Sequence, residues 1–186
     1  MIIAIGGLHG SGKTTYAKIL ARQLGLQHVS AGELFRQIAN KKGLTLDELG
    51  RVASKDPSID LLIDRRTKRL ARKGNVVVDG QLAAWMLRNK ADLKIYLLTP
   101  DEERFSRLAK RDRVAKESAR KETASREAVQ QQRYLKHYGI DLVDLSPYDI
   151  VLDTSLGSIQ EVAGILSETA KQALKRLNRS YSPNRL

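Results

Sequence analysis

The chain has 186 residues, of which 33 are lysine or arginine and 21 are aspartate or glutamate, so its formal net charge is +12. A hydrophobic share of 41% predicts a folded globular domain, and the absence of cysteine excludes disulfides, thiolate metal sites and cysteine nucleophiles. The apolar run at the N-terminus is too short to span a membrane and leads straight into a glycine-rich turn, so we expect no signal peptide, no membrane association and a cytoplasmic protein.

The first predicted elements are a buried strand at Ile2–Ile5, a glycine-rich loop and a helix that ends at Gly25. The loop reads Gly7-Leu8-His9-Gly10-Ser11-Gly12-Lys13-Thr14-Thr15 and fits the phosphate-binding pattern G-x-x-x-x-G-K-[ST]. Its backbone N–H groups and the start of the helix form an anion site, while Lys13 reaches phosphate and Thr14 ligates Mg²⁺. The loop therefore predicts binding of a nucleoside triphosphate.

A second strand over Leu26–Val29 leads to Ser30 and to a short helix that carries Arg36. Ligands bind at the carboxyl ends of strands in open α/β sheets, so Arg36 is suitably placed to hold a second phosphate. Residues 30–73 read as helical without a strand, and Thr45 and Glu48 form a capping box within them. We therefore predict a helical insertion between the second and third strands.

The third strand, Val76–Val78, ends at Asp79-Gly80. A carboxylate in an apolar strand needs a partner, and Asp79 is placed to hold a magnesium-bound water beside Thr14.

The fourth strand, Leu93–Leu98, precedes a basic helix on which Arg104, Arg107 and Arg111 share one face. Residues 113–138 are so polar that we expect a mobile helical flap, ordered by what it grips and carrying Arg126 and Arg133. The fifth strand is Ile150–Leu152, and the basic tail 178–186 is expected to be frayed. Strands that alternate with helices predict an α/β fold with a five-stranded parallel sheet.

Two anion sites, a magnesium carboxylate and a flap with arginines together indicate phosphoryl transfer between nucleotides. The charge of +12 also suits a different class, an ATP-switched factor that binds RNA or the ribosome. Few aromatic residues lie among the basic ones, which makes a platform for stacking bases a weaker interpretation.

The chain resembles the nucleoside monophosphate kinases, most closely the archaeal-type cytidylate kinases, from Met1 to about Lys171. The resemblance rests on the phosphate loop and on five further blocks, namely Ser30-Ala31-Gly32-Glu33-Leu34-Phe35-Arg36, Asp64-Arg65-Arg66, Val78-Asp79-Gly80-Gln81-Leu82-Ala83-Ala84-Trp85-Met86, Arg133-Tyr134 with Tyr138-Gly139-Ile140-Asp141, and Leu152-Asp153-Thr154-Ser155.

The resemblance implies ATP-dependent phosphorylation of CMP and dCMP with Mg²⁺, by a monomer with the three-layer fold of P-loop NTPases. It also implies a division of the chain into a core (1–29, 74–103 and 136–177), a monophosphate-binding insertion (30–73), a lid (104–135) and a tail (178–186).

The resemblance further implies the roles of the site residues. The loop from Gly7 to Thr15 would hold ATP, and Arg107, Arg111, Arg126 and Arg133 would meet the phosphates when the lid closes. The acceptor would be bound by Ser30, Gly32, Arg36, Asp64, Arg65, Asp79, Gly80 and Gln81. No general base is required, because the acceptor is already an anion.

One departure from the family pattern is Gln81, where cytidylate kinases commonly carry arginine. Glutamine makes no charged bidentate contact, so we expect acceptor affinity or base choice to differ. AMP, UMP and dephospho-coenzyme A therefore stay open as alternative acceptors.

Overall fold

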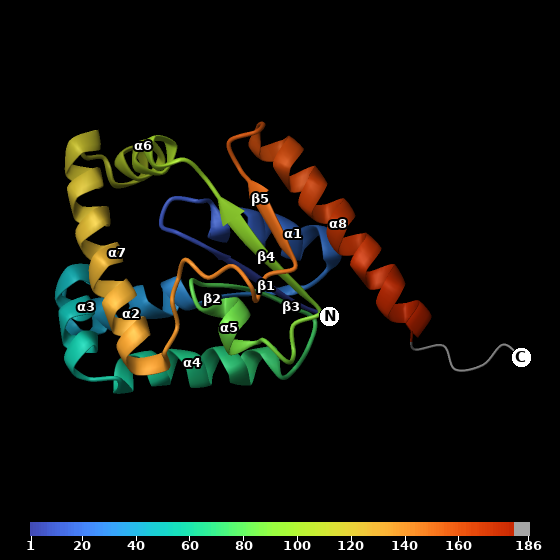
Figure 1. The fold of residues 1–186 in the computed structure, drawn as a ribbon, viewed down its shortest axis with the longest axis horizontal. Coiled ribbons are helices and arrows are strands. Elements are labelled where there is room, and N and C mark those ends of the chain that lie inside the picture. The colour runs from blue at the N-terminus through green and yellow to red at the C-terminus, as the bar shows by residue number, and fades with distance from the viewer. Residues whose placement is uncertain (181–186) are drawn as a thin grey trace, which may run out of the picture.

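The computed structural model describes the backbone of residues 1–180 and the side chains of residues 1–176. The elements follow the chain in the order β1 (Ile2–Gly7), α1 (Lys13–Leu24), β2 (Gln27–Ser30), α2 (Ala31–Lys42), α3 (Leu46–Lys55), α4 (Ser58–Ala71), β3 (Val76–Asp79), α5 (Ala83–Met86), β4 (Leu93–Leu98), α6 (Asp101–Asp112), α7 (Lys116–Tyr138), β5 (Ile150–Asp153) and α8 (Ile159–Ser180) (Figure 1).

The five strands form one sheet in the order β2-β3-β1-β4-β5, and every neighbouring pair is parallel. This confirms the predicted α/β class and five-stranded parallel sheet. In the pairing register, Asp79 lies beside Ile5 of β1 on one side and beside Ser30 of β2 on the other. The carboxyl ends of these strands therefore meet at one edge, directly above the turn that follows β1.

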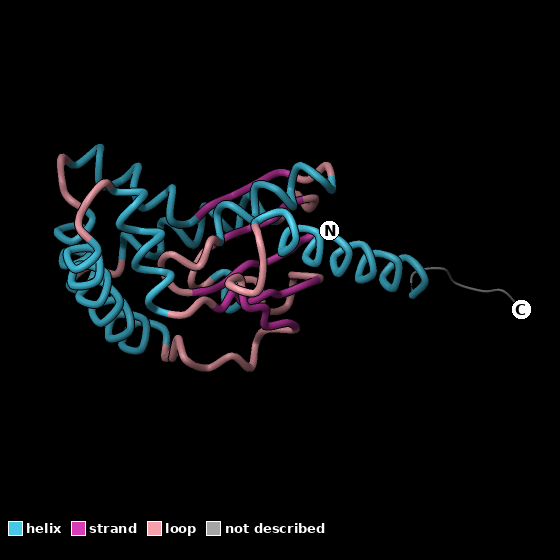
Figure 2. The backbone as a smooth tube through the Cα atoms, turned by 90° about the horizontal axis from the view of Figure 1, so that it is seen from above, coloured by secondary structure: helices cyan, strands magenta, loops and turns pink. Residues whose placement is uncertain are grey.

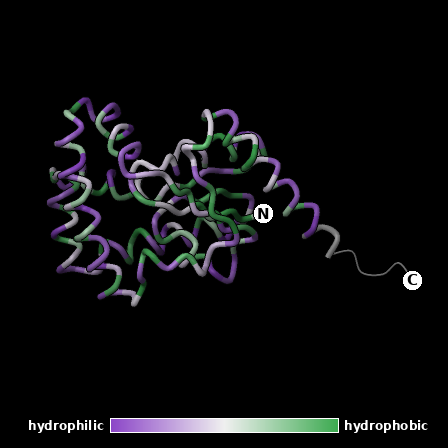
Figure 3. Tube along the Cα trace, turned by 45° about the horizontal axis from the view of Figure 1, so that its top comes forward, coloured by the Kyte–Doolittle hydropathy of each residue, from purple (hydrophilic) through white to green (hydrophobic). Residues whose placement is uncertain are grey.

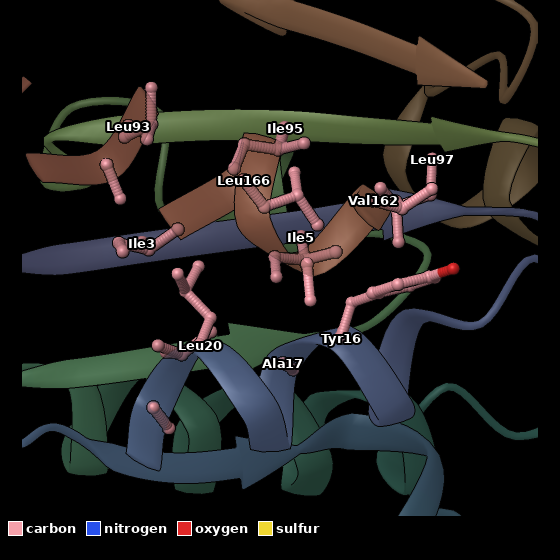
Figure 4. Packing of buried hydrophobic residues seen from close by; sticks show 14 residues of the cluster. Ile3, Ile5, Tyr16, Ala17, Leu20, Leu93, Ile95, Leu97, Val162 and Leu166 are labelled. Carbon is pink, nitrogen blue, oxygen red and sulfur yellow. The ribbon is translucent and has the colours of Figure 1, made fainter. Parts of the chain in front are cut away.

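Helices cover both faces of the sheet, so the strands are runs of apolar residues rather than alternating ones (Figure 2). On one face, Ile5 and Ile95 of the sheet pack with Leu20 of α1 and Leu166 of α8 (Figure 4). On the other face, a second cluster joins Ala4, Val78 and the short helix α5.

Helices α2, α3 and α4 confirm that residues 30–73 contain no strand after Ser30, and they gather at one end of the sheet together with α6 and α7 (Figure 1). They have an apolar cluster of their own around Leu34, Leu49 and Ile63. The predicted capping box at Thr45 and Glu48 is present at the start of α3.

The polar segment after α6 packs on its neighbours more than its composition predicts. It forms one helix, α7, which is largely hydrophilic (Figure 3) but buries Ala119, Thr123 and Arg133. Ala119 packs on Leu108 and Ala109 of α6, and further along α7 contacts α3. Near the other end of α7, Tyr134 and Tyr138 pack on an apolar cluster around Leu82, so apolar contacts hold the segment at both ends.

The tail predicted to be frayed starts at residue 178, but α8 continues as a helix to Ser180. The rest of that tail, residues 181–186, lies outside the described residues. Within the described part of the chain, no helix is both long and apolar enough to cross a membrane.

Candidate active site

A cleft of about 1160 Å³ lies at the carboxyl ends of β1 and β3, between the sheet and the helices at its end. Its walls come from the phosphate loop, the insertion helices, the β3–α5 turn, α6, α7 and the start of α8. Most of the predicted site residues line it, namely His9, Gly10, Gly12, Lys13, Thr14, Thr15, Gly32, Arg36, Asp64, Asp79, Gly80, Gln81, Arg107, Arg111 and Arg126.

The phosphate loop needs glycine at two positions. Gly10 and Gly12 have φ values of +79° and +86°, and a Cβ on Gly10 would lie 2.7 Å from the Arg104 carbonyl oxygen. Lys13 curls back over the loop and donates from Nζ to the Leu8 carbonyl at 2.7 Å. Burial lowers the pKa of Lys13 to about 8, so this cation sits where an anionic partner would stabilise its charge.

Asp79 is 2% exposed and is surrounded by donors. Its Oδ2 accepts from the Thr14 hydroxyl at 2.9 Å and from the Ser30 hydroxyl at 3.1 Å, while His28 Nε2 lies 2.5 Å from Oδ1. These contacts supply the partner that a buried carboxylate requires. Sequence reasoning missed His28, although its spacing of two from Ser30 on β2 puts both on one face of the sheet.

Arg36, Arg111 and Arg126 concentrate positive charge at the insertion side of the cleft. Arg126 is half-buried, and burial is the main reason that its pKa is lowered, with the charges of Arg111 and Arg36 adding to the effect. Its nearest carboxylate, on Glu122, lies 3.7 Å away. Arg111 donates to the neighbouring Asp112 at 2.7 and 2.8 Å. Three cations that face a common space with these two carboxylates still leave an excess of positive charge, which suits a polyanion.

Arg107 lies over the phosphate loop and donates to Thr154 at both its hydroxyl, 2.9 Å, and its carbonyl oxygen, 3.0 Å. It thus joins α6 to the turn after β5, on the side of the cleft that the phosphate loop forms.

Arg104 is 2% exposed and does not share the cavity face with the two arginines that follow it. It donates to the His9 carbonyl at 2.6 Å and to Glu127 of α7 at 2.8 Å. Glu127 also accepts from the His9 backbone N–H at 3.1 Å. These contacts tie α6 and α7 to the phosphate loop.

The structure also places Arg133 away from the cleft. Its guanidinium is buried between α7, α3 and α4, where Nε lies 3.0 Å from Asp60 Oδ2 and Nη1 donates to the Gly50 carbonyl at 3.2 Å. The seven residues that separate Arg133 from Arg126 amount to about 10 Å along a helix, which carries Arg133 past the cluster of arginines. In this structure Arg133 therefore has protein partners, and its expected contact with phosphates stays a prediction.

Arg65 is exposed on the outside of α4, whereas Ser30 lies behind Asp79 rather than in the wall of the cleft. Gly7, Leu8 and Ser11 of the phosphate loop likewise do not line it.

Sequence reasoning missed the apolar walls of the cleft. They come from the insertion helices and the β3–α5 turn, and include Phe35, Leu46, Ile63, Leu82 and Met86. Met86 is half-buried and lines the cleft. The spacing of Asp60, Ile63, Asp64 and Thr67 was the available signal, because these positions share one face of α4.

Comparison with known proteins gives a consistent result. The profile of the Cytidylate kinase-like family matches residues 2–156. A cytidylate kinase from Staphylothermus marinus is 45% identical over 175 residues, which cover 94% of this chain and 99% of that protein. One from Pyrococcus horikoshii is 46% identical over 166 residues, covering 89% and 86%.

Among solved structures, a shikimate kinase from Bacteroides thetaiotaomicron aligns with a TM-score of 0.62 and 18% identity, covering 92% of this chain and 98% of that one. At this identity the likeness concerns the fold alone.

Proposed function

This chain belongs to the cytidylate kinase-like family, and on that premise we propose that its cleft transfers the γ-phosphoryl group of ATP to CMP or dCMP. The products are ADP and the corresponding cytidine diphosphate. We further propose that a monomer performs the reaction, since both anion sites of the cleft are built from residues of the same chain.

The observation that carries this proposal is the pairing of two anion sites in one cleft. The phosphate loop with Lys13 is suited to the triphosphate, and the cluster of Arg36, Arg111 and Arg126 is suited to a second phosphate beside it. A hydrolase needs the first site but not the second. Charge neutralised from both sides favours transfer between two bound phosphates.

Magnesium fits the donor half. Thr14 and Asp79 lie together and offer hydroxyl and carboxylate oxygens, the donors that Mg²⁺ prefers. Within the described residues no group of three acidic or histidine side chains could hold a metal by itself, so we assign most of the ligands to the nucleotide and water. We propose that Thr14 binds the ion directly and Asp79 through water. When bound, the ion neutralises charge on the phosphate oxygens.

In the acceptor half, we propose that Arg36 of α2 grips the monophosphate and that Gly32, Asp64, Gly80 and Gln81 surround the nucleoside. The acceptor phosphate is already an anion, so the protein needs to orient it and neutralise its charge rather than remove a proton. We propose that α7 closes over both nucleotides and excludes water, which would otherwise hydrolyse ATP.

An acceptor panel tests the proposal. Purified protein is incubated with ATP, Mg²⁺ and, in turn, CMP, dCMP, UMP, AMP or dephospho-coenzyme A, and ADP formation is followed. We expect the highest kcat/KM with CMP or dCMP, and no transfer when EDTA removes the metal. Transfer to AMP but not to CMP would overturn the base assignment, and ADP release without a phosphorylated acceptor would overturn transfer itself.

A further inference from the structure

The acceptor side of the cleft has the form of a slot with apolar walls and polar edges. One wall is the face of α4 that carries Ile63, and the facing wall is the β3–α5 turn with Leu82 and Met86. Asp64 and Thr67 lie on the same face of α4 as Ile63, and Gln81 lies on the opposite wall. A flat ring fits such walls, and its edge atoms would meet these polar side chains.

Several of these polar atoms have no partner within the described part of the chain. Thr67 Oγ1 and Gln81 Nε2 are buried without a hydrogen bond. Asp64 accepts a single hydrogen bond, at Oδ2, which leaves Oδ1 available. Buried polar atoms without partners cost free energy, and native proteins keep few of them unless a ligand or water satisfies them. These unsatisfied atoms therefore outline a ligand that offers at least one donor and at least one acceptor.

The orientation of Asp64 is set from outside α4. The Tyr138 hydroxyl, near the end of α7, donates to Asp64 Oδ2 at 2.6 Å. One turn earlier on α4, Asp60 forms an ion pair with Arg133 of α7, whose Nε lies 3.0 Å from Asp60 Oδ2. Asp60 already has a cationic partner, so Asp64 is the carboxylate that is left to face the cleft with an available oxygen.

We propose that Asp64 determines base choice by accepting a hydrogen bond from the 4-amino group of cytosine, and that Tyr138 is its positioning residue. The Gln81 amide and the Thr67 hydroxyl supply donors for the two acceptors of the base, the ring nitrogen N3 and the carbonyl oxygen O2. This inference rests on the proposed function and names the residues behind its specificity.

The same arrangement rejects uracil. A carboxylate accepts from the exocyclic amino group of cytosine. Uracil has a carbonyl oxygen there, so two acceptors would face each other and both would stay unpaired. Sites built to hydrogen-bond a substrate group discriminate strongly against analogues that lack it. Gln81 then serves as a neutral donor to the base.

Three acceptors and four variants test the inference. The acceptors are CMP, UMP and the ribonucleoside monophosphate of 2-pyrimidinone, which lacks the 4-amino group and is otherwise matched to CMP. The variants are Asp64→Ala, Asp64→Asn, Tyr138→Phe and a control, Glu168→Gln, which removes the charge of an exposed residue on α8. The readout is kcat/KM for each acceptor, with the melting temperature of each variant as a check on folding.

In the wild type we expect CMP to exceed the pyrimidinone nucleotide by about 10- to 100-fold, the range of a hydrogen bond to a charged group. Asp64→Ala should bring these two acceptors within about threefold of each other. Asp64→Asn, whose amide can donate, should raise UMP relative to CMP. Tyr138→Phe should narrow the CMP preference in part, and Glu168→Gln should leave it unchanged.

Equal use of CMP and the pyrimidinone nucleotide by the wild type would overturn the inference, whether or not any variant folds. An equal loss on all three acceptors in Asp64→Ala would do the same, because it would show a structural role. Wild-type protein that transfers to none of them would instead refute the proposed function.

Discussion

Replacing Arg133 by alanine separates a structural role for this residue from the phosphate contact expected from the sequence. The guanidinium is 1% exposed, pairs with Asp60 and donates to Gly50, so its loss leaves a buried carboxylate without a partner. Breaking a buried pair in this way costs about 3–5 kcal/mol. For a chain of this length, each kcal/mol lowers the melting temperature by about 2–4 °C, so we expect a drop of about 6–20 °C.

The assay compares Arg133→Ala with Arg126→Ala by calorimetry and by steady-state kinetics. Arg126 has one distant ion-pair partner and its charge is disfavoured by burial, so its removal should change the melting temperature little while lowering kcat sharply. Asp60→Asn combined with Arg133→Ala should recover part of the lost stability, because the unpaired charge is gone. A drop of less than 2 °C for Arg133→Ala would refute the reasoning.

Further outcomes follow from the site. Lys13→Ala should lower kcat at least 10³-fold while circular dichroism shows an unchanged fold, and a smaller loss would count against its contact with the phosphates. Arg36→Ala should raise KM for CMP more than tenfold and leave KM for ATP unchanged; equal effects on both would contradict its assignment to the acceptor. Burial raises the pKa of Asp64, so kcat/KM for CMP should fall as pH drops through that raised pKa, above the ordinary value near 3.8, and a flat profile would argue against an ionised Asp64. Glu127→Ala should lower stability by about 1–3 kcal/mol, since Arg104 and the His9 amide lose an acceptor, as denaturant titration would measure.

Local patterns predicted the sheet well, because its strands are buried on both faces and read as apolar runs such as Leu93–Leu98. The phosphate loop and Asp79 could be predicted equally well, since each follows directly after a strand that the sequence identifies. These predictions depend on residues close together in the chain.

What the sequence did not predict is the set of contacts between distant segments. Arg126 and Arg133 look alike on α7, and only the packing of α3 and α4 against that helix separates one that lines the cleft from one buried beside Asp60. The same holds for Tyr138 and Asp64, which are 74 residues apart. The hydrophobic pattern of a sequence does not indicate which distant residues contact each other.

The packing of α7 on α3 also bears on how chains of this kind can change over evolutionary time. Arg133 reaches both the carbonyl of Gly50 and the carboxylate of Asp60, so inserting or deleting a residue between α3 and α4 would break one contact or the other. The chain between Gly50 of α3 and Asp60 of α4 is therefore not free to change in length. A substitution that shortens the side chain at position 133 calls for a matching neutral residue at position 60, and the two positions should be inherited as a pair.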